Sequence, residues 1–137
     1  MPEIHSITFP DQSTSELRVF RAEKENAPIL IIFTAMGVKA AYYRYYAARM
    51  IDYGIHVALI DQRGNGKSSI RAGNGVDFGY KEIVEMDYPV ILKNIKELFP
   101  DSKRYIMGHS LGGQMGSMFA TKHPELVDGL ILNASCL

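Results

Sequence analysis

The sequence contains one cysteine, no long apolar run and no excess of either charge. A single cysteine, Cys136, excludes an internal disulfide framework and a thiolate metal cluster, and suits a reducing compartment. The longest apolar run, Ile29 to Phe33, is far too short to span a bilayer, and the N-terminus lacks the pattern of a signal peptide. Fifteen basic residues balance fifteen acidic ones, so no bulk field attracts nucleic acid. We therefore expect a cytoplasmic protein without a transmembrane segment or a nucleic-acid partner.

The composition is that of an ordinary globular chain. Apolar residues make up 47% and charged residues 22% of the 137 positions, far from the profile of a disordered chain. A chain of this length fits one domain, and no repeat, linker or low-complexity tract divides it. The sequence predicts a single domain over residues 1–137.

Strand and helix patterns alternate along the chain. Loose alternation around Asp11-Gln12-Ser13 predicts a β-hairpin within the first 22 residues. Apolar runs without alternation are typical of strands covered on both faces, and helical spacing marks the segments between them. The predicted strands are 28–33, 55–60, 104–107 and 127–132, and the predicted helices are 40–53, a segment through 84–98, and 111–122. This order predicts an α/β fold with a doubly wound, mainly parallel sheet preceded by a hairpin.

Two helices carry more detailed expectations. In the first, Tyr42, Tyr46, Ala47 and Met50 recur at three- and four-residue spacing, which predicts that they face inward. In the second, Pro89 allows two interpretations. It either sits in a first turn capped by Asp87, or kinks a longer helix that begins near Tyr80.

A short motif with catalytic geometry follows the strand at 104–107. The run Gly108-His-Ser110-Leu-Gly112 lies between a predicted strand and a predicted helix, which places Ser110 in a turn of two or three residues. Glycines without a β-carbon let the strand and helix pass close together, and the Leu111 amide at the helix N-terminus points a donor at a developing oxyanion. The competing interpretation is a glycine-rich turn with an incidental serine.

With these motifs the chain resembles the α/β-hydrolase family. Asp61-Gln-Arg63-Gly64-Asn-Gly66-Lys-Ser68 is similar to a loop that shapes the rim of the site in that family. A phosphate-loop interpretation fails because the glycine required five positions before Gly66 is Asp61. The segments Met36-Gly-Val38 and 42–46, which is rich in tyrosine, resemble a poorly characterised bacterial group of these hydrolases.

The resemblance implies a serine hydrolase acting on a small-molecule ester or other acyl substrate. It implies Ser110 as the nucleophile and the amides of Leu111 and Met36 as the oxyanion hole, with the Ala35 amide as the second choice for the latter. No cofactor is implied. The four histidines show no paired ligand spacing, so the sequence predicts no metal site either.

The chain offers no evident base for Ser110. His123, Glu125 and Asp128 lie in or just after the predicted helix, at the end remote from Ser110, and we expect His109 to be packed or hydrogen-bonded instead. The family continues into a lid and further strands that carry the acid and the base, so we expect a truncated N-terminal portion of a hydrolase. Two alternatives stand beside it. One is a split enzyme completed by a second polypeptide, and the other a non-catalytic small-molecule or protein-binding module, in which an exposed sheet edge favours self-association.

Overall fold

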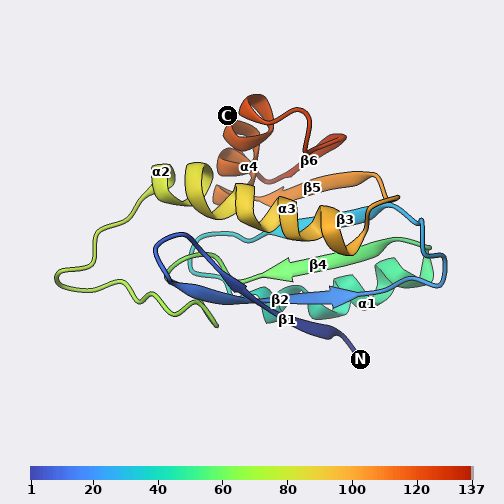
Figure 1. Ribbon diagram of the computed structural model, residues 1–137, viewed down its shortest axis with the longest axis horizontal. Coiled ribbons are helices and arrows are strands. Elements are labelled where there is room, and N and C mark those ends of the chain that lie inside the picture. The colour runs from blue at the N-terminus through green and yellow to red at the C-terminus, as the bar shows by residue number, and fades with distance from the viewer. Residues whose placement is uncertain (137) are drawn as a thin grey trace.

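A six-stranded sheet with helices on both faces forms the body of the protein. The computed structural model describes residues 1–136, and Figure 1 shows α3 and α4 on the near face of the sheet and α1 behind it. The strands are β1 (Glu3–Thr8), β2 (Thr14–Phe20), β3 (Ile29–Phe33), β4 (His56–Ile60), β5 (Arg104–His109) and β6 (Gly129–Asn133). The helical segments are η1 (Ala40–Tyr43), α1 (Arg44–Asp52), α2 (Tyr80–Glu82), η2 (Ile83–Asp87), α3 (Tyr88–Leu98) and α4 (Leu111–Lys122).

The strand order confirms the predicted doubly wound, mainly parallel sheet. Neighbours run β1-β2-β4-β3-β5-β6, with β3 to β6 mutually parallel and β1 and β2 forming the expected antiparallel hairpin. The chain leaves β3 toward β4 on one side and leaves β5 toward β6 on the other. The carboxyl ends of β3 and β5 therefore lie side by side where the connections diverge, which is where α/β sheets bind ligands.

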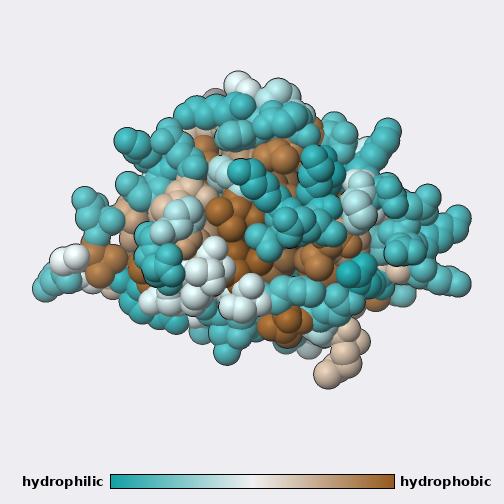
Figure 2. All heavy atoms as spheres, viewed as in Figure 1, coloured by the Kyte–Doolittle hydropathy of each residue, from teal (hydrophilic) through white to brown (hydrophobic). Residues whose placement is uncertain are grey.

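Both faces of the central strands are buried, as the apolar runs predict. Ile29, Ile31 and Phe33 point into the core under α3 and α4, whereas Leu30 and Ile32 join the core beneath α1. Successive side chains of a strand alternate between faces, so each must be apolar when both faces are covered. Figure 2 shows hydrophilic side chains around most of the near surface, with hydrophobic ones gathered toward its centre.

The helix around Pro89 is the longer of the two alternatives. Helical residues begin at Tyr80, and η2 is a π-helical segment in which the Tyr88 amide donates to the Ile83 carbonyl, five residues back. The widened turn accommodates a proline, which has no amide hydrogen, at the second position of α3. Asp87 makes no capping hydrogen bond there.

The tyrosine-rich helix follows the prediction in part. Ala47 is buried and Met50 packs against the core beneath α1, as expected. Tyr42 and Tyr46, also expected inward, are 71% and 41% exposed, and Tyr43 is buried instead. The reason is that η1 is a 3₁₀-helix with three residues per turn, so Ala40 and Tyr43 share its inner side before the α-helix begins.

Within residues 1–136, none of the helices has the length and apolar character required to cross a membrane.

Candidate active site

Ser110 occupies a one-residue turn between β5 and α4. The strand continues through His109 and the helix starts at Leu111, so the turn is tighter than the two or three residues expected. Ser110 has φ 54° and ψ −116°, a conformation that L-residues rarely adopt and that costs on the order of 1–3 kcal/mol. The half-buried serine is held there by its amide, which donates to the Asn133 carbonyl of β6 at 2.9 Å.

Glycines beside the turn let the strand and helix touch. A β-carbon on Gly108 would collide with Gly113, and one on Gly112 would collide with the Phe33 carbonyl at the end of β3. Because the obstacles are backbone atoms, a side chain has no room at either position. The sequence reasoning correctly assigned these glycines to close packing.

Ser135 supports the same turn, and the sequence analysis did not identify it. Its hydroxyl donates to the Ser110 carbonyl at 2.9 Å, and that carbonyl also accepts from the Gly113 amide. Only the pairing of β6 with β5 brings residue 135 back to the turn. No local sequence signal would have revealed the contact.

The two residues whose amides are the predicted oxyanion donors line one cavity. Leu111 is the first residue of α4, and Met36 lies in the loop after β3. Within residues 1–136 neither amide donates a hydrogen bond, whereas the Ala35 amide donates to the Tyr43 hydroxyl at 3.1 Å. Of the two candidates in this loop, Met36 is therefore the one whose amide remains open to a ligand.

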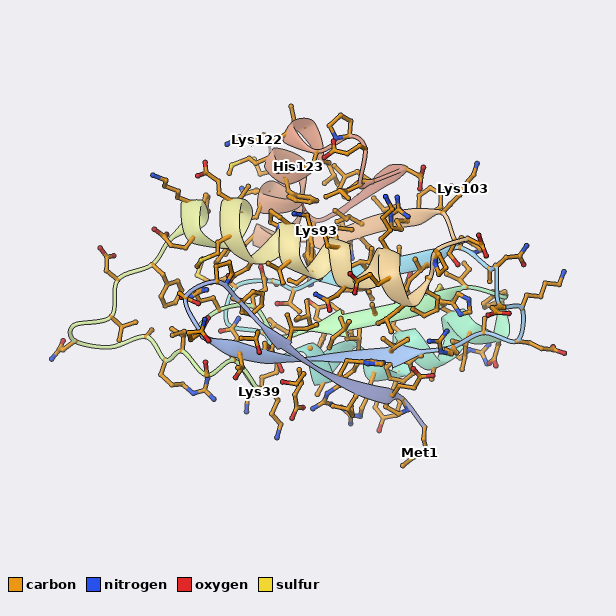
Figure 3. The ribbon with its side chains drawn as sticks, in the orientation of Figure 1. Met1, Lys39, Lys93, Lys103, Lys122 and His123 are labelled. Carbon is orange, nitrogen blue, oxygen red and sulfur yellow. The ribbon has the colours of Figure 1, made fainter. Side chains whose placement is uncertain are left out.

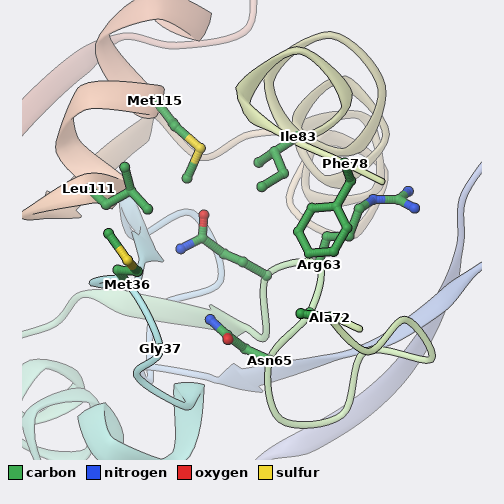
Figure 4. A pocket seen from close by; sticks show the side chains of 11 residues that line it. Met36, Gly37, Arg63, Asn65, Ala72, Phe78, Ile83, Leu111 and Met115 are labelled. Carbon is green, nitrogen blue, oxygen red and sulfur yellow. The ribbon is translucent and has the colours of Figure 1, made fainter. Parts of the chain in front are cut away.

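The cavity between these segments has a volume of about 240 Å³ and a mainly apolar lining. Figure 4 shows Met36, Leu111 and Met115 on one side of it, with Ile83 and Phe78 across from them. The remaining lining residues are Gly37, Gln62, Arg63, Gly64, Asn65 and Ala72. Such a pocket can hold an apolar group next to the two amides.

The loop 61–68 is held by its own carboxylate. Asp61, which is buried, accepts hydrogen bonds from the Ala40 amide at 2.7 Å and the Lys67 amide at 3.0 Å. A β-carbon on Gly66 would collide with that carboxylate. These contacts give the loop a structural role at the rim.

A charge cluster that is buried at Arg63 and Asp87 fixes the first part of this loop. Arg63 donates to both carboxylate oxygens of Asp87, at 2.9 and 2.7 Å, and to Asp11 at 2.6 Å. The hydrogen bond from Arg63 holds the pKa of Asp11 below its usual range, while burial raises the pKa of the Asp87 carboxyl against the opposing effect of Arg63. The Asp87 carboxylate thus anchors Arg63 and does not cap the helix.

The histidines lie as the sequence suggests. The His109 Nδ1 atom is 2.8 Å from the Tyr43 hydroxyl, so this residue is hydrogen-bonded. His123 lies next to Lys122 at the end of α4 (Figure 3), about 18 Å of helix from Ser110, and its Nδ1 atom contacts Glu125 at 3.2 Å. Asp128 accepts from the Arg104 amide at the opposite end of β5. Within residues 1–136, no group of three metal-ligating side chains gathers to hold an ion.

Comparison with known proteins identifies the family. A family model described as serine aminopeptidase, S33, matches residues 24–137. The chain belongs to this family of α/β-hydrolases. It is 30% identical over 90 residues to the proline iminopeptidase of Saccharolobus solfataricus, and 28% identical over 120 residues to lysophospholipase L2 of Escherichia coli.

Solved structures have the same fold at lower identity. A thermostable carboxyl esterase from Bacillus coagulans superposes with a TM-score of 0.84 at 24% identity, over 96% of this chain and 43% of that one. A thioesterase domain from the curacin biosynthetic pathway superposes with a TM-score of 0.79 at 17% identity, over 100% of this chain and 47% of that one. The matched region is 64% of this chain and 26% of the iminopeptidase, and 84% of this chain and 34% of the lysophospholipase. The chain thus spans about a quarter to a third of these curated relatives.

Proposed function

We propose that this chain contributes the nucleophile and the oxyanion hole of a serine hydrolase for ester or similar acyl substrates. The observation that carries the proposal is the strained one-residue turn at Ser110, beside a cavity shared by Leu111 and Met36. A protein retains such a backbone conformation only where the surroundings enforce it, and such strain clusters at active sites. Membership of a hydrolase family supports the same assignment.

The reaction follows from this arrangement. The Ser110 oxygen attacks the acyl carbon, its proton passes to a general base, and the carbonyl oxygen becomes an oxyanion that accepts hydrogen bonds from the Leu111 and Met36 amides. Collapse releases the alcohol, which takes up the proton, and leaves an acyl-Ser110 ester. Attack by water then frees the acid and restores the serine. The apolar cavity favours a substrate with an apolar group beside the scissile bond.

We propose further that the base and its carboxylate partner come from polypeptide outside residues 1–136. Within those residues, His109 bonds to Tyr43 and His123 lies at the far end of α4. The relatives are about three to four times as long as the part that this chain matches. Either a continuation of a partial hydrolase domain or a second chain would complete the triad.

A fluorophosphonate probe tests the proposal directly. The chain is treated alone and together with the polypeptide encoded downstream, expressed separately or as a continuation. We expect labelling in the completed form and none in Ser110→Ala, because the probe reacts only with an activated serine. Ser6→Ala, which removes an exposed hydroxyl on β1, should label like the wild type. Labelling that persists in Ser110→Ala, or absence of labelling in every form, would contradict the assignment.

A second candidate function is association through the sheet edge. Among residues 1–136, strand β6 pairs with β5 on one side and has no partner on the other, and its residues Ile131 and Leu132 are exposed. Unpaired backbone groups on an apolar edge favour pairing with another strand, here a second copy of this chain. Ile131→Lys should lower the dimer fraction in sedimentation equilibrium, while Ile4→Lys on the opposite edge should not. A monomer at all concentrations would refute this association.

A further inference from the structure

One tyrosine hydroxyl connects the two segments that carry the proposed oxyanion donors. Tyr43, the last residue of η1, is 7% exposed, and its oxygen lies 3.1 Å from the Ala35 amide nitrogen and 2.8 Å from the Nδ1 atom of His109. Ala35 directly precedes Met36, and His109 directly precedes Ser110. The contact therefore spans the gap between the loop after β3 and the turn after β5.

The direction of the first hydrogen bond follows from the groups involved, and that of the second is set by the tautomer of His109. The Ala35 amide can only donate, so the Tyr43 oxygen accepts from it. The phenolic hydrogen can then be given to His109 Nδ1, which requires a neutral imidazole with its proton on Nε2. Burial raises the pKa of the Tyr43 hydroxyl, which keeps that hydrogen in place. In this tautomer the Ala35 amide, the Tyr43 hydroxyl and the Nδ1 atom of His109 each have a hydrogen-bond partner.

We propose that Tyr43 is a positioning residue for the reaction at Ser110, setting the separation of the Met36 and Leu111 amides by joining Ala35 to His109. This inference rests on the proposed function. Oxyanion donors act only when they sit within hydrogen-bond distance of the developing charge, so a displacement of about 1 Å weakens catalysis substantially. Tyr43 acts through the backbone of its neighbours, and its side chain is not part of the lining of the cavity shared by Met36 and Leu111.

A second side chain, Gln62, also binds this loop, and its contact lies farther from Met36. Gln62 donates to the Thr34 carbonyl at 2.7 Å, and its own oxygen accepts from the buried Tyr88 hydroxyl. The Met36 side chain is 74% exposed and contributes little anchoring. The Tyr43 hydroxyl is therefore the side-chain group bonded next to the proposed donor, whereas Gln62 secures the end of the strand.

The chain supplies a matched control in the preceding residue. Tyr42 is 71% exposed, its ring meets the Tyr43 ring edge-on at 5.4 Å, and its hydroxyl makes no hydrogen bond within residues 1–136. Tyr42→Phe and Tyr43→Phe thus remove the same atom from neighbouring positions. Only the second removes the connection.

The kinetic test uses the completed form that the fluorophosphonate probe labels, with a p-nitrophenyl ester as substrate. Tyr43→Phe should lower kcat about three- to tenfold, the scale of one neutral hydrogen bond, and leave KM nearly unchanged. Tyr42→Phe should stay within about twofold of the wild type in both constants. Equal kcat values in the two variants, or a change confined to KM, would overturn the positioning role.

A spectroscopic test is independent of activity. In the 137-residue chain, ¹⁵N spectra of the imidazoles should show His109 with its proton on Nε2, and Tyr43→Phe should shift Nδ1 and accelerate hydrogen exchange of the Ala35 amide. Tyr42→Phe should change neither, and circular dichroism verifies that each variant folds. Unchanged His109 and Ala35 signals in Tyr43→Phe would refute the connection itself. Ser110-independent turnover would instead refute the proposed function, and the positioning role with it.

Discussion

The two faces of the sheet are packed to different degrees. Under α3 and α4, aromatic rings interlock, with Phe33 stacked on Tyr88 at 3.7 Å and Tyr88 edge-on to Phe119 at 5.9 Å. The opposite face carries only η1 and α1 within residues 1–136, and a mainly apolar hollow of about 290 Å³ remains open between Tyr46, Tyr105 and Ile131. The turn at Ser110 is built against the denser face, since α4 starts from it. A strained residue persists where the surroundings over-determine its conformation.

The largest expected effect is the loss of an aromatic ring from the denser face. Phe119 is fully buried, so Phe119→Ala removes its contacts and leaves a cavity that costs about 3–5 kcal/mol of the free energy of unfolding. Urea denaturation followed by circular dichroism measures this loss. A cost below about 1 kcal/mol would show that the face under α3 and α4 tolerates the loss of a side chain as well as the open face does.

A β-carbon in the contact between α4 and β3 should have the next largest effect. In Gly112→Ala the added atom meets the Phe33 carbonyl, a backbone group that cannot turn aside, so we expect a loss of about 3 kcal/mol. The control is Gly73→Ala, since Gly73 has nothing within 4 Å of the added atom and no left-handed backbone. Similar urea midpoints for both variants would contradict the close approach.

The buried charges on the denser face predict a dependence on pH. Because Arg63 lowers the pKa of Asp11, the stability from this pair is fully present above the unfolded pKa of about 3.8 and is lost as the pH falls below it. The Asp11 side chain is 37% exposed, so screening keeps the effect below about 1 kcal/mol. Asp11→Asn should reduce the change in the urea midpoint between about pH 5 and about pH 2, the range that brackets that pKa. If the urea midpoint of Asp11→Asn varied with pH as it does in the wild type, the Asp11–Arg63 pair would be excluded as the source of the pH dependence.

The open face should show the smallest change in stability. Ile131 is 48% exposed on an edge strand, so Ile131→Thr should alter the free energy of unfolding by no more than about 0.5 kcal/mol. Thermal unfolding at low protein concentration, where strands do not pair between molecules, measures this. A loss comparable to that of Phe119→Ala would show that the open face is packed as firmly as the other.

Local patterns predicted the elements well because their signals are local. Runs such as Ile29 to Phe33 are apolar without alternation since both faces are covered, and the hairpin turn at 11–13 lies where expected. Of the positions expected to face inward in the tyrosine-rich helix, Ala47 and Met50 were right. Tyr42 and Tyr46 were wrong, because a 3₁₀ start changes the number of residues per turn. The helix around Pro89 stayed undecided, since a π-helical turn leaves no distinct sequence pattern.

The sequence by itself determined the order of strands and helices, the hydrolase resemblance and the position of Ser110 in a strand-to-helix turn. The order follows from hydrophobic spacing, the position of Ser110 from glycines at fixed distances along the chain, and the resemblance from motifs such as those at 61–68 and 108–112. Only the tertiary structure decided that Ser135 supports that turn and that Tyr43 joins Ala35 to His109. Such contacts connect residues that are distant in sequence, and their geometry depends on how strands pair and helices rotate, which neighbouring residues do not encode.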